Sequence, residues 1–391
     1  MMPRLLLLTA SELTRDPRAR RATAAARGRG IDVVGLSGQV SGEDVVSLDG
    51  VPIVRIGPKG RTRTTQEEGI PPQRSAVERE LRGLVRLGRF GARTVRLWRG
   101  GRGLGRFDVV HANDLDTLPA GWLLARRSGA RLVYDAHELY AEFDAHPSRV
   151  YKAVATKIEA ALARRAAAVA TVNEPLADEL AQRFALRRRP RVVLNAPELD
   201  PRDPLERPDA TQLAAIYQGA LGPGRPLSDL LDALEMAPSV RLAVRIVRFD
   251  PRDLQARAEA RGLGDRVDIL DPLPLDRIID GLREFDVGLI FDRPLTRNAE
   301  LSLPNKLFEY LMAGLAIAAP RLPGLAALVE DERVGVLFTP GRPAELGEVL
   351  ENLARDRKLL GELRRRARQL AVERYNAEAQ ASVLAAAWGA S

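Results

Sequence analysis

One short run of the chain combines the residue types that bind a phosphate and a ribose. Pro304 stands where a helix would start, and Gly314 stands where that helix would end. The free amides of a first helical turn form an anion site, to which Lys306 adds a positive charge. Glu309 follows about one and a half turns into the helix, where its two oxygens could accept both hydroxyls of a ribose. The spacing favours a nucleotide-sugar site; the alternative is a capped surface helix with solvated side chains.

The lysine of this run is unusual for the chain. The sequence has 60 lysine and arginine residues, and all but five of them are arginine. A compact ammonium suits a crowded phosphate site better than a flat guanidinium does. The lysine at position 306 therefore supports the anion site, although compositional drift toward arginine could also leave a few lysines anywhere.

A glycine-rich turn after residues 214–218 carries a second pattern for phosphate binding. Gly219 ends a predicted strand, and Arg225 follows two further glycines before a predicted helix at residues 227–234. Such a turn lets the backbone approach a phosphate, which an arginine can clamp. The Walker pattern and the dinucleotide fingerprint are both absent from the sequence, and a simple turn is the alternative.

Polar side chains follow two predicted strands. They belong to His111, Asn113, Asp114, Asp116, Asp135, His137 and Glu138. Because the carboxyl ends of strands in an open α/β sheet face the crevice, both groups should face it. His137 and Glu138 are predicted to contact a sugar, the alternative being a helix-capping pair. Asp114 and Asp116 resemble a metal-binding pair but can equally cap a helix, and we predict no metal.

The elements that position these residues alternate between short apolar strands and helices, which is typical of a doubly wound parallel sheet. The predicted strands span residues 4–9, 31–36, 51–56, 109–112, 131–134, 168–172, 192–194, 214–218, 241–247, 267–270, 287–290, 316–319 and 335–338. A proline-rich stretch interrupts them and can form neither helix nor strand interior.

The pattern therefore predicts two α/β domains with a cleft between them. The predicted parts are an N-terminal domain at residues 1–197, a linker at 198–210, a second domain at 211–372 and a C-terminal helix at 373–391. The helix is long enough to reach back to the first domain, and the tail from residue 385 is expected to fray.

Composition limits the kinds of site that the chain can hold. It has 391 residues, no cysteine and three histidines, so a disulfide framework is excluded and a zinc site is disfavoured. The apolar run at residues 5–8 is too short for a signal sequence, and no stretch approaches the roughly 18–20 apolar residues of a membrane span. We therefore expect a cytoplasmic protein. The net charge of +8 favours acidic partners such as nucleotides, anionic lipids or nucleic acids.

A row of arginines spans Arg79–Arg96 and recurs every three or four residues, so it occupies roughly a third of a helix circumference. Five apolar residues fall on the opposite side: Val77, Leu81, Leu84, Val95 and Trp98. Three interpretations are open, namely a solvated face of a core-packed helix, peripheral contact with an anionic membrane or a lipid-linked phosphate acceptor, and nucleic acid. The lack of an aromatic platform or a known binding module argues against nucleic acid.

Together these motifs resemble those of glycosyltransferase family 4, in a bacterial branch whose donor helix reads LPNKLFEY. The motifs are Asp16-Pro17-Arg18, Val110-His111-Ala112-Asn113-Asp114, Tyr134-Asp135-Ala136-His137-Glu138, Val193-Leu194-Asn195-Ala196-Pro197, Tyr217-Gln218-Gly219 and the run Leu303–Tyr310. The resemblance covers nearly the whole chain. It implies the GT-B fold, in which two Rossmann-like domains face each other and a C-terminal helix crosses back. It also implies retaining transfer of a sugar from a nucleotide-diphosphate sugar to a hydroxyl of a polysaccharide, glycolipid or natural product, without a metal or other cofactor.

The resemblance further implies roles for individual residues. Those expected around the donor are Gly219, Arg225, Ser302, Leu303, Pro304, Asn305, Lys306 and Glu309, with Glu309 on the ribose. His137, together with Asp114 or Glu138, would orient the sugar or the acceptor hydroxyl. The first glutamate of the family's Glu-x7-Glu pattern falls at Leu301, which is apolar.

Two other functions are open at this point. A GT-B enzyme of another class, such as a nucleotide-sugar epimerase or a pseudoglycosyl coupling enzyme, would have the same donor helix. A basic protein with a degenerate cleft would bind polyanions or membranes without binding nucleotides, and Leu301 in place of a glutamate favours this alternative. Product analysis distinguishes a glycosyltransferase from an epimerase, because an epimerase acts on the donor alone whereas a transferase needs an acceptor.

Overall fold

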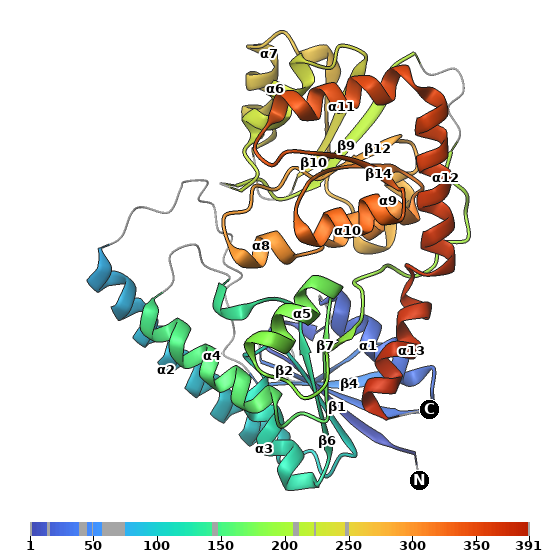
Figure 1. The fold of residues 1–391 in the computed structure, drawn as a ribbon. Coiled ribbons are helices and arrows are strands. Elements are labelled where there is room, and N and C mark those ends of the chain that lie inside the picture. Colours follow the sequence, from blue (N-terminus) through green and yellow to red (C-terminus); the bar gives the residue numbers. More distant parts are fainter. Residues whose placement is uncertain are drawn as a thin grey trace.

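The computed structural model of the chain describes residues 2–13, 16–38, 45–48, 50–56, 75–142, 148–205, 211–222, 224–246 and 250–389. Two α/β domains each form a sheet with helices on both faces, and the last helix returns from the second domain to the first (Figure 1). The fold class predicted from the sequence is confirmed. Residues 198–205 of the predicted linker form neither helix nor strand, and residues 206–210 lie outside the described part.

The N-terminal domain has an eight-stranded sheet in the order β3-β4-β2-β1-β5-β6-β7-β8, in which only β3 and β4 pair antiparallel. Its strands are β1 (Arg4–Thr9), β2 (Asp32–Ser37), β3 (Val45–Leu48), β4 (Val51–Arg55), β5 (Val109–Asn113), β6 (Arg131–Ala136), β7 (Ala168–Thr171) and β8 (Arg191–Val192). Its helices are α1 (Pro17–Arg27), α2 (Ala76–Gly101), α3 (Leu118–Ser128), the short η2 (Tyr140–Glu142), α4 (Arg149–Ala163) and α5 (Glu174–Arg183). Seven of these strands were predicted, and β3 was not.

The second domain has a parallel six-stranded sheet in the order β11-β10-β9-β12-β13-β14. Its strands are β9 (Leu213–Gly219), β10 (Val240–Ile246), β11 (Val267–Leu270), β12 (Val287–Leu289), β13 (Ala316–Pro320) and β14 (Gly335–Phe338). Its helices are α6 (Leu227–Glu235), α7 (Pro251–Glu259), α8 (Arg297–Leu301), α9 (Asn305–Met312), α10 (Pro323–Asp331), α11 (Pro343–Arg355) and α12 (Arg357–Glu373), after which α13 (Ala377–Trp388) ends the chain. Among the described residues, no helix is long and apolar enough to span a membrane.

Helices on both faces explain why the central strands are continuous apolar runs. All four leucines of β1 are fully buried. Leu6 and Leu8 belong to the apolar cluster beneath α2–α5, whereas Leu5 and Leu7 belong to the cluster beneath α1 and α13. A parallel sheet covered on both faces needs this pattern, because neither side of the strand meets water.

The chain crosses back to the first domain through α12 and α13. Helix α12 packs against α9, and α13 packs against α1 and β7. Trp388 at the end of α13 is buried, and its Nε1 donates a hydrogen bond to His111 Nδ1 at 3.0 Å. The predicted fraying of the tail is therefore wrong for residues 385–389, because the indole anchors the last turn; residues 390 and 391 lie outside the described part.

Candidate functional site

The strand order of each sheet fixes where a site can form. Chain direction across the sheet reverses between β1 and β5 in the first domain and between β9 and β12 in the second. In open α/β sheets, ligands bind beyond the carboxyl ends of the strands at this point of reversal. Asp114 follows β5 at the first of these points, and Gly219 ends β9 at the second.

Helix α9 begins as predicted next to this point, but its first turn differs in one detail. Pro304 is the N-cap residue with extended backbone (φ −71°, ψ 145°), not the first helical residue. Leu303 is buried in the core, and the hydroxyl of Ser302 donates to the carbonyl of Ala299 at 3.3 Å. Of the predicted set, these residues therefore offer backbone to a ligand, whereas Asn305 is exposed at the tip.

Lys306 is a buried cation at this tip. Its Nζ lies 4.3 Å from the centre of the Tyr217 ring and has no hydrogen-bond partner among the described residues. Burial lowers the pKa of Lys306 to about 8, against the opposing charge of Asp292. Gly219 has φ +138°, and a Cβ there would lie 3.5 Å from Lys306 Nζ. A buried ammonium without a hydrogen-bond acceptor is costly, so this site is built to receive an anionic ligand.

Arg225 and Glu309 complete the donor side of the site. Arg225 forms an ion pair with Asp292, and its guanidinium contributes to lowering the pKa of Lys306. The carboxylate of Glu309 accepts a hydrogen bond from Gln218 Nε2, and burial raises its pKa. The structure thus brings together the predicted Gly219, Arg225, Lys306 and Glu309.

Three further residues of this side were not predicted. Asp292 partners Arg225, Gln218 donates to Glu309, and Arg21 of α1 interacts electrostatically with Glu309 from the first domain. Gln218 lies inside the Tyr217-Gln218-Gly219 motif, and Asp292 follows the predicted strand at 287–290. Their positions at the ends of strands were the sequence signal that could have identified them as site residues. Nothing in the spacing of Arg21 indicated a partner in the other domain.

On the other side of the site, His137 lies between two carboxylates. Its Nδ1 is 3.3 Å from Asp114 Oδ1, and its Nε2 is 3.4 Å from Asp135 Oδ2. Asp114 adopts φ 63°, a conformation disfavoured for a residue other than glycine and often found at functional sites. Burial lowers the pKa of His137, but Asp114 and Asp135 outweigh burial and raise it to about 10. The two carboxylates therefore favour the charged ring, which can donate hydrogen bonds from both nitrogens.

Asp135 holds this group together. It accepts two hydrogen bonds from Arg18, at 2.7 Å from Nε and 2.6 Å from Nη2, and His111 Nε2 lies 3.4 Å from it. Burial raises the pKa of Asp135, but Arg18 and His137 outweigh it and keep the pKa well below the ordinary range. Arg18 also donates to the Val193 carbonyl at 2.8 Å. The Asp16-Pro17-Arg18 motif therefore supplies a buried structural cation.

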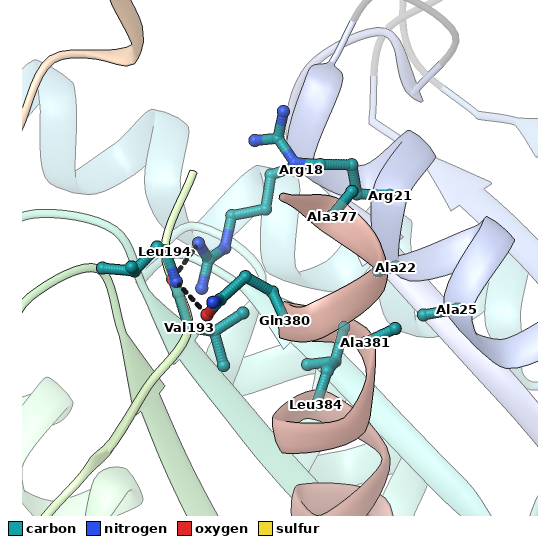
Figure 2. A pocket seen from close by; sticks show the side chains of 10 residues that line it. All are labelled: Arg18, Arg21, Ala22, Ala25, Val193, Leu194, Ala377, Gln380, Ala381 and Leu384. Atoms are coloured by element: carbon teal, nitrogen blue, oxygen red, sulfur yellow. Dashed lines mark hydrogen bonds between the residues drawn. The ribbon is translucent and has the colours of Figure 1, made fainter. Parts of the chain in front are cut away.

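Figure 2 shows α13 next to the chain segment that Arg18 contacts. Gln380 of α13 accepts a hydrogen bond from the amide of Leu194 at 3.0 Å, beside the segment that binds Arg18. The cavity between α1 and α13 has a volume of about 20 Å³, with Ala22 of α1 and Leu384 of α13 in its walls. A space of that size holds about one water and no organic ligand.

Glu138 is the second carboxyl that faces the cleft. Burial and the charge of Asp114 together raise the pKa of Glu138 to about 7. Near neutral pH it can therefore bind or release a proton, which suits a group in contact with a reacting hydroxyl. Asp116 is placed differently, because it pairs with Arg93 and accepts from the Tyr140 hydroxyl. In the described part of the chain, no three His, Asp or Glu side chains are grouped to hold a metal ion.

Leu301 lies in the contact between the two domains. Its side chain is buried in the apolar cluster of the first domain, and its carbonyl accepts from Asn173 Nδ2 at 2.6 Å. Next to it, Asn298 Oδ1 accepts from the Leu139 amide at 2.8 Å. The neighbouring Glu300 pairs with Arg297 at 2.7 Å. The position of the family's first glutamate is thus a packing contact in this chain.

The charge of His137 gives a direct test by NMR. We expect its imidazole to keep both protons up to about pH 10, since both carboxylates stabilise the charged form. By linkage, the stability that this charge contributes is complete below pH 6.5, the ordinary pKa of histidine, and is lost as the pH rises through about 10. Histidine ¹⁵N shifts followed over pH check this, with His137→Gln identifying the resonance. A His137 signal that titrates near pH 6.5 would contradict the assignment.

Comparison with known proteins adds the following. The family model Glycosyltransferase Family 4 matches residues 19–200, and Glycosyl transferases group 1 matches residues 216–356. No curated protein matches the chain.

Among solved structures, the chain is similar to HepE of Anabaena in complex with UDP, with a TM-score of 0.71 at 15% identity over 100% of both chains. The HepE complex with UDP-glucose has a TM-score of 0.68 at 16% identity, over 99% of this chain and 100% of that one. Sucrose-phosphate synthase of Thermosynechococcus elongatus has a TM-score of 0.69 at 16% identity, over 97% of this chain and 96% of that one. At these identities the similarity shows the fold.

Proposed function

We propose that this chain, which is a glycosyltransferase of the GT-B type, transfers a sugar from a nucleoside-diphosphate sugar to an acceptor hydroxyl with retention of anomeric configuration. The observation that carries the proposal is the buried ammonium of Lys306 at the tip of α9, which has no hydrogen-bond partner in the described part of the chain, with Glu309 farther along the same helix. A diphosphate at that tip would neutralise the ammonium and accept from the first amides of the helix. Glu309 would then accept from the ribose hydroxyls, releasing Gln218.

In the proposed reaction, the bond from the anomeric carbon to the diphosphate breaks while a bond to the acceptor oxygen forms on the same face. The hydroxyl proton passes to an oxygen of the departing phosphate. Lys306, Arg225 and the amides of α9 stabilise the charge that develops on the diphosphate, which is the largest contribution that preorganised groups make. No side-chain nucleophile is required.

The first domain supplies the groups that orient the sugar and the acceptor. His137 donates from its charged ring, whose position Asp114 and Asp135 fix. Glu138, with a pKa raised to about 7, is suited to hold the acceptor hydroxyl. HepE is similar in fold and was crystallised with UDP-glucose, so UDP-glucose is the first donor to test.

Product analysis tests this proposal. The protein would be incubated with nucleotide sugars and simple acceptors, and the anomeric coupling of the product would be read by proton NMR. We expect nucleoside diphosphate release that depends on an acceptor, a retained configuration and the same rate in EDTA. An inverted product would contradict the retaining mechanism, and conversion of the donor alone would favour the epimerase alternative.

The lowered pKa of Lys306 predicts how donor binding depends on pH. Because the ammonium of the free protein loses its proton above about pH 8, we expect affinity for a nucleoside diphosphate to fall about tenfold between pH 7 and pH 9. Isothermal titration with UDP at both values measures the change. Lys306→Arg is the control, since a guanidinium stays charged over this range. An equal fall in wild type and in Lys306→Arg would contradict the role of Lys306.

A further inference from the structure

The outer face of α2 is apolar and exposed. Val77 is 77% exposed, Leu81 62%, Leu84 55% and Val95 44%. The helix packs on the core through Leu97, Phe90 and Trp98, and most of its arginines are exposed, as the interpretation of a solvated arginine face expects. That interpretation is wrong only in placing the four apolar residues on the packed side. At Gly83 the helix approaches α4 closely, because a Cβ there would lie 2.1 Å from Ser148 Oγ of the α4 N-cap.

The exposed apolar residues form one stripe with arginines along its edge. At 100° per residue, Val77, Leu81, Leu84 and Val95 fall within an arc of roughly 60°. Arg82, Arg89 and Arg96 recur every seven residues and follow this arc on one side. Within the described part of the chain these three arginines have neither an ion pair nor a hydrogen bond, so their charges are available to a partner.

A groove between α2 and α4 extends this surface toward the catalytic cleft. Its volume is about 680 Å³, and Arg82, Arg86 and Arg89 line it. The guanidinium of Arg86 lies 4.1 Å above the ring of Tyr151. Asp116, at the floor of the groove, is two residues from Asp114, the partner of His137. The groove therefore joins a cationic surface to the acceptor side of the site.

We propose that the outer face of α2 docks on an anionic membrane. The stripe enters the boundary between headgroups and acyl chains, and the three arginines contact lipid phosphates. A free polyanion would satisfy the arginines and leave the stripe in water, whereas a bilayer satisfies both. Figure 1 places α2 and α4 on the side of the first domain away from α13. If the chain transfers a sugar as proposed above, this orientation favours an acceptor that is held in the same membrane.

Sedimentation of the full chain with lipid vesicles tests the proposal. We expect binding to vesicles of phosphatidylcholine mixed with phosphatidylglycerol and none to phosphatidylcholine alone. The triple variant R82Q/R89Q/R96Q should bind on the order of 100-fold more weakly, at about fivefold per arginine. L81S/L84S should lose about tenfold or more, since each leucine no longer buries apolar surface in the lipid.

Matched controls remove the same groups elsewhere. Arg187→Gln/Arg188→Gln/Arg252→Gln removes three exposed charges, and Leu275→Ser/Met236→Ser removes two exposed apolar side chains. Both controls should bind vesicles like wild type, and circular dichroism confirms folding of each variant.

Absence of binding to anionic vesicles, or equal losses in the arginine control, would overturn the proposal. Heparin binding as tight as vesicle binding, with L81S/L84S unchanged, would replace it by a polyanion site. The assay needs neither donor nor turnover, so failure of the proposed function leaves its result intact.

Discussion

Lys306→Ala is expected to lower kcat/KM about 100- to 1,000-fold, the range found for removal of one preorganised group that stabilises a developing negative charge. The same change should leave the free energy of unfolding unchanged or raise it. The reason is that the ammonium is buried without a hydrogen-bond partner in the described structure, so its removal relieves a desolvation penalty. Steady-state kinetics and urea denaturation of the same preparation measure both quantities.

Two further variants separate charge from shape at this position. Lys306→Met keeps most of the side-chain volume and should be as inactive as Lys306→Ala. Lys306→Arg keeps the charge and should retain part of the activity, because its planar head fits less well beside Tyr217. Parallel losses of activity and stability in all three variants would show that the lysine is structural.

Asp135→Asn is expected to reduce the free energy of unfolding by about 3–5 kcal/mol, the cost of leaving a buried charge without its partner. Arg18 would lose its charged partner and one of its two hydrogen bonds to residue 135, because an amide side chain has one acceptor oxygen. His137 would lose one of the two charges that raise its pKa, so its ¹⁵N titration should shift toward lower pH. Urea denaturation and NMR give the two readings.

The pH dependence of this loss has a definite sign. The lowered pKa of Asp135 means that its contribution to stability is complete above pH 3.8, the ordinary pKa of aspartate, and is lost as the pH falls toward the lowered pKa. The difference between wild type and Asp135→Asn should therefore shrink in acid. Asp32→Asn is the matched control, since Asp32 pairs with Arg4 in solvent and should contribute less than about 1 kcal/mol. Equal losses in the two variants would contradict the buried assignment.

The strands were predictable because they are buried on both faces and so appear as uninterrupted apolar runs. Arg4–Thr9, Val267–Leu270 and Gly335–Phe338 agree with the prediction at both ends. Strand β3 pairs at the sheet edge with β4 and carries no such run. Helix α9 was predictable for a local reason, because the residues that start it and end it lie in the sequence next to it.

The acceptor side of the site depends on contacts that no local pattern contains. Asp135 meets Arg18 across 117 residues, and His111 meets Trp388 across 277. The helical period of α2 correctly separated the arginine arc from the apolar arc, but most residues of both arcs are exposed. The period did not indicate that a third arc, with Gly83 and Leu97, packs on the domain, where the lack of a side chain at Gly83 lets α4 approach.

Binding of a nucleoside diphosphate at the tip of α9 is the central claim, and a thermal-shift panel tests it most directly. UDP, other nucleoside diphosphates and their sugars would be added to wild type, Lys306→Ala and Glu309→Ala, with the exposed Lys358→Ala as control. A ligand at about 100 times its Kd adds about 2.7 kcal/mol of stability. We expect one nucleotide to stabilise wild type and Lys358→Ala and to have no such effect on the other two variants. A nucleotide shift that persists in both Lys306→Ala and Glu309→Ala, or no shift with any nucleotide, would contradict the account.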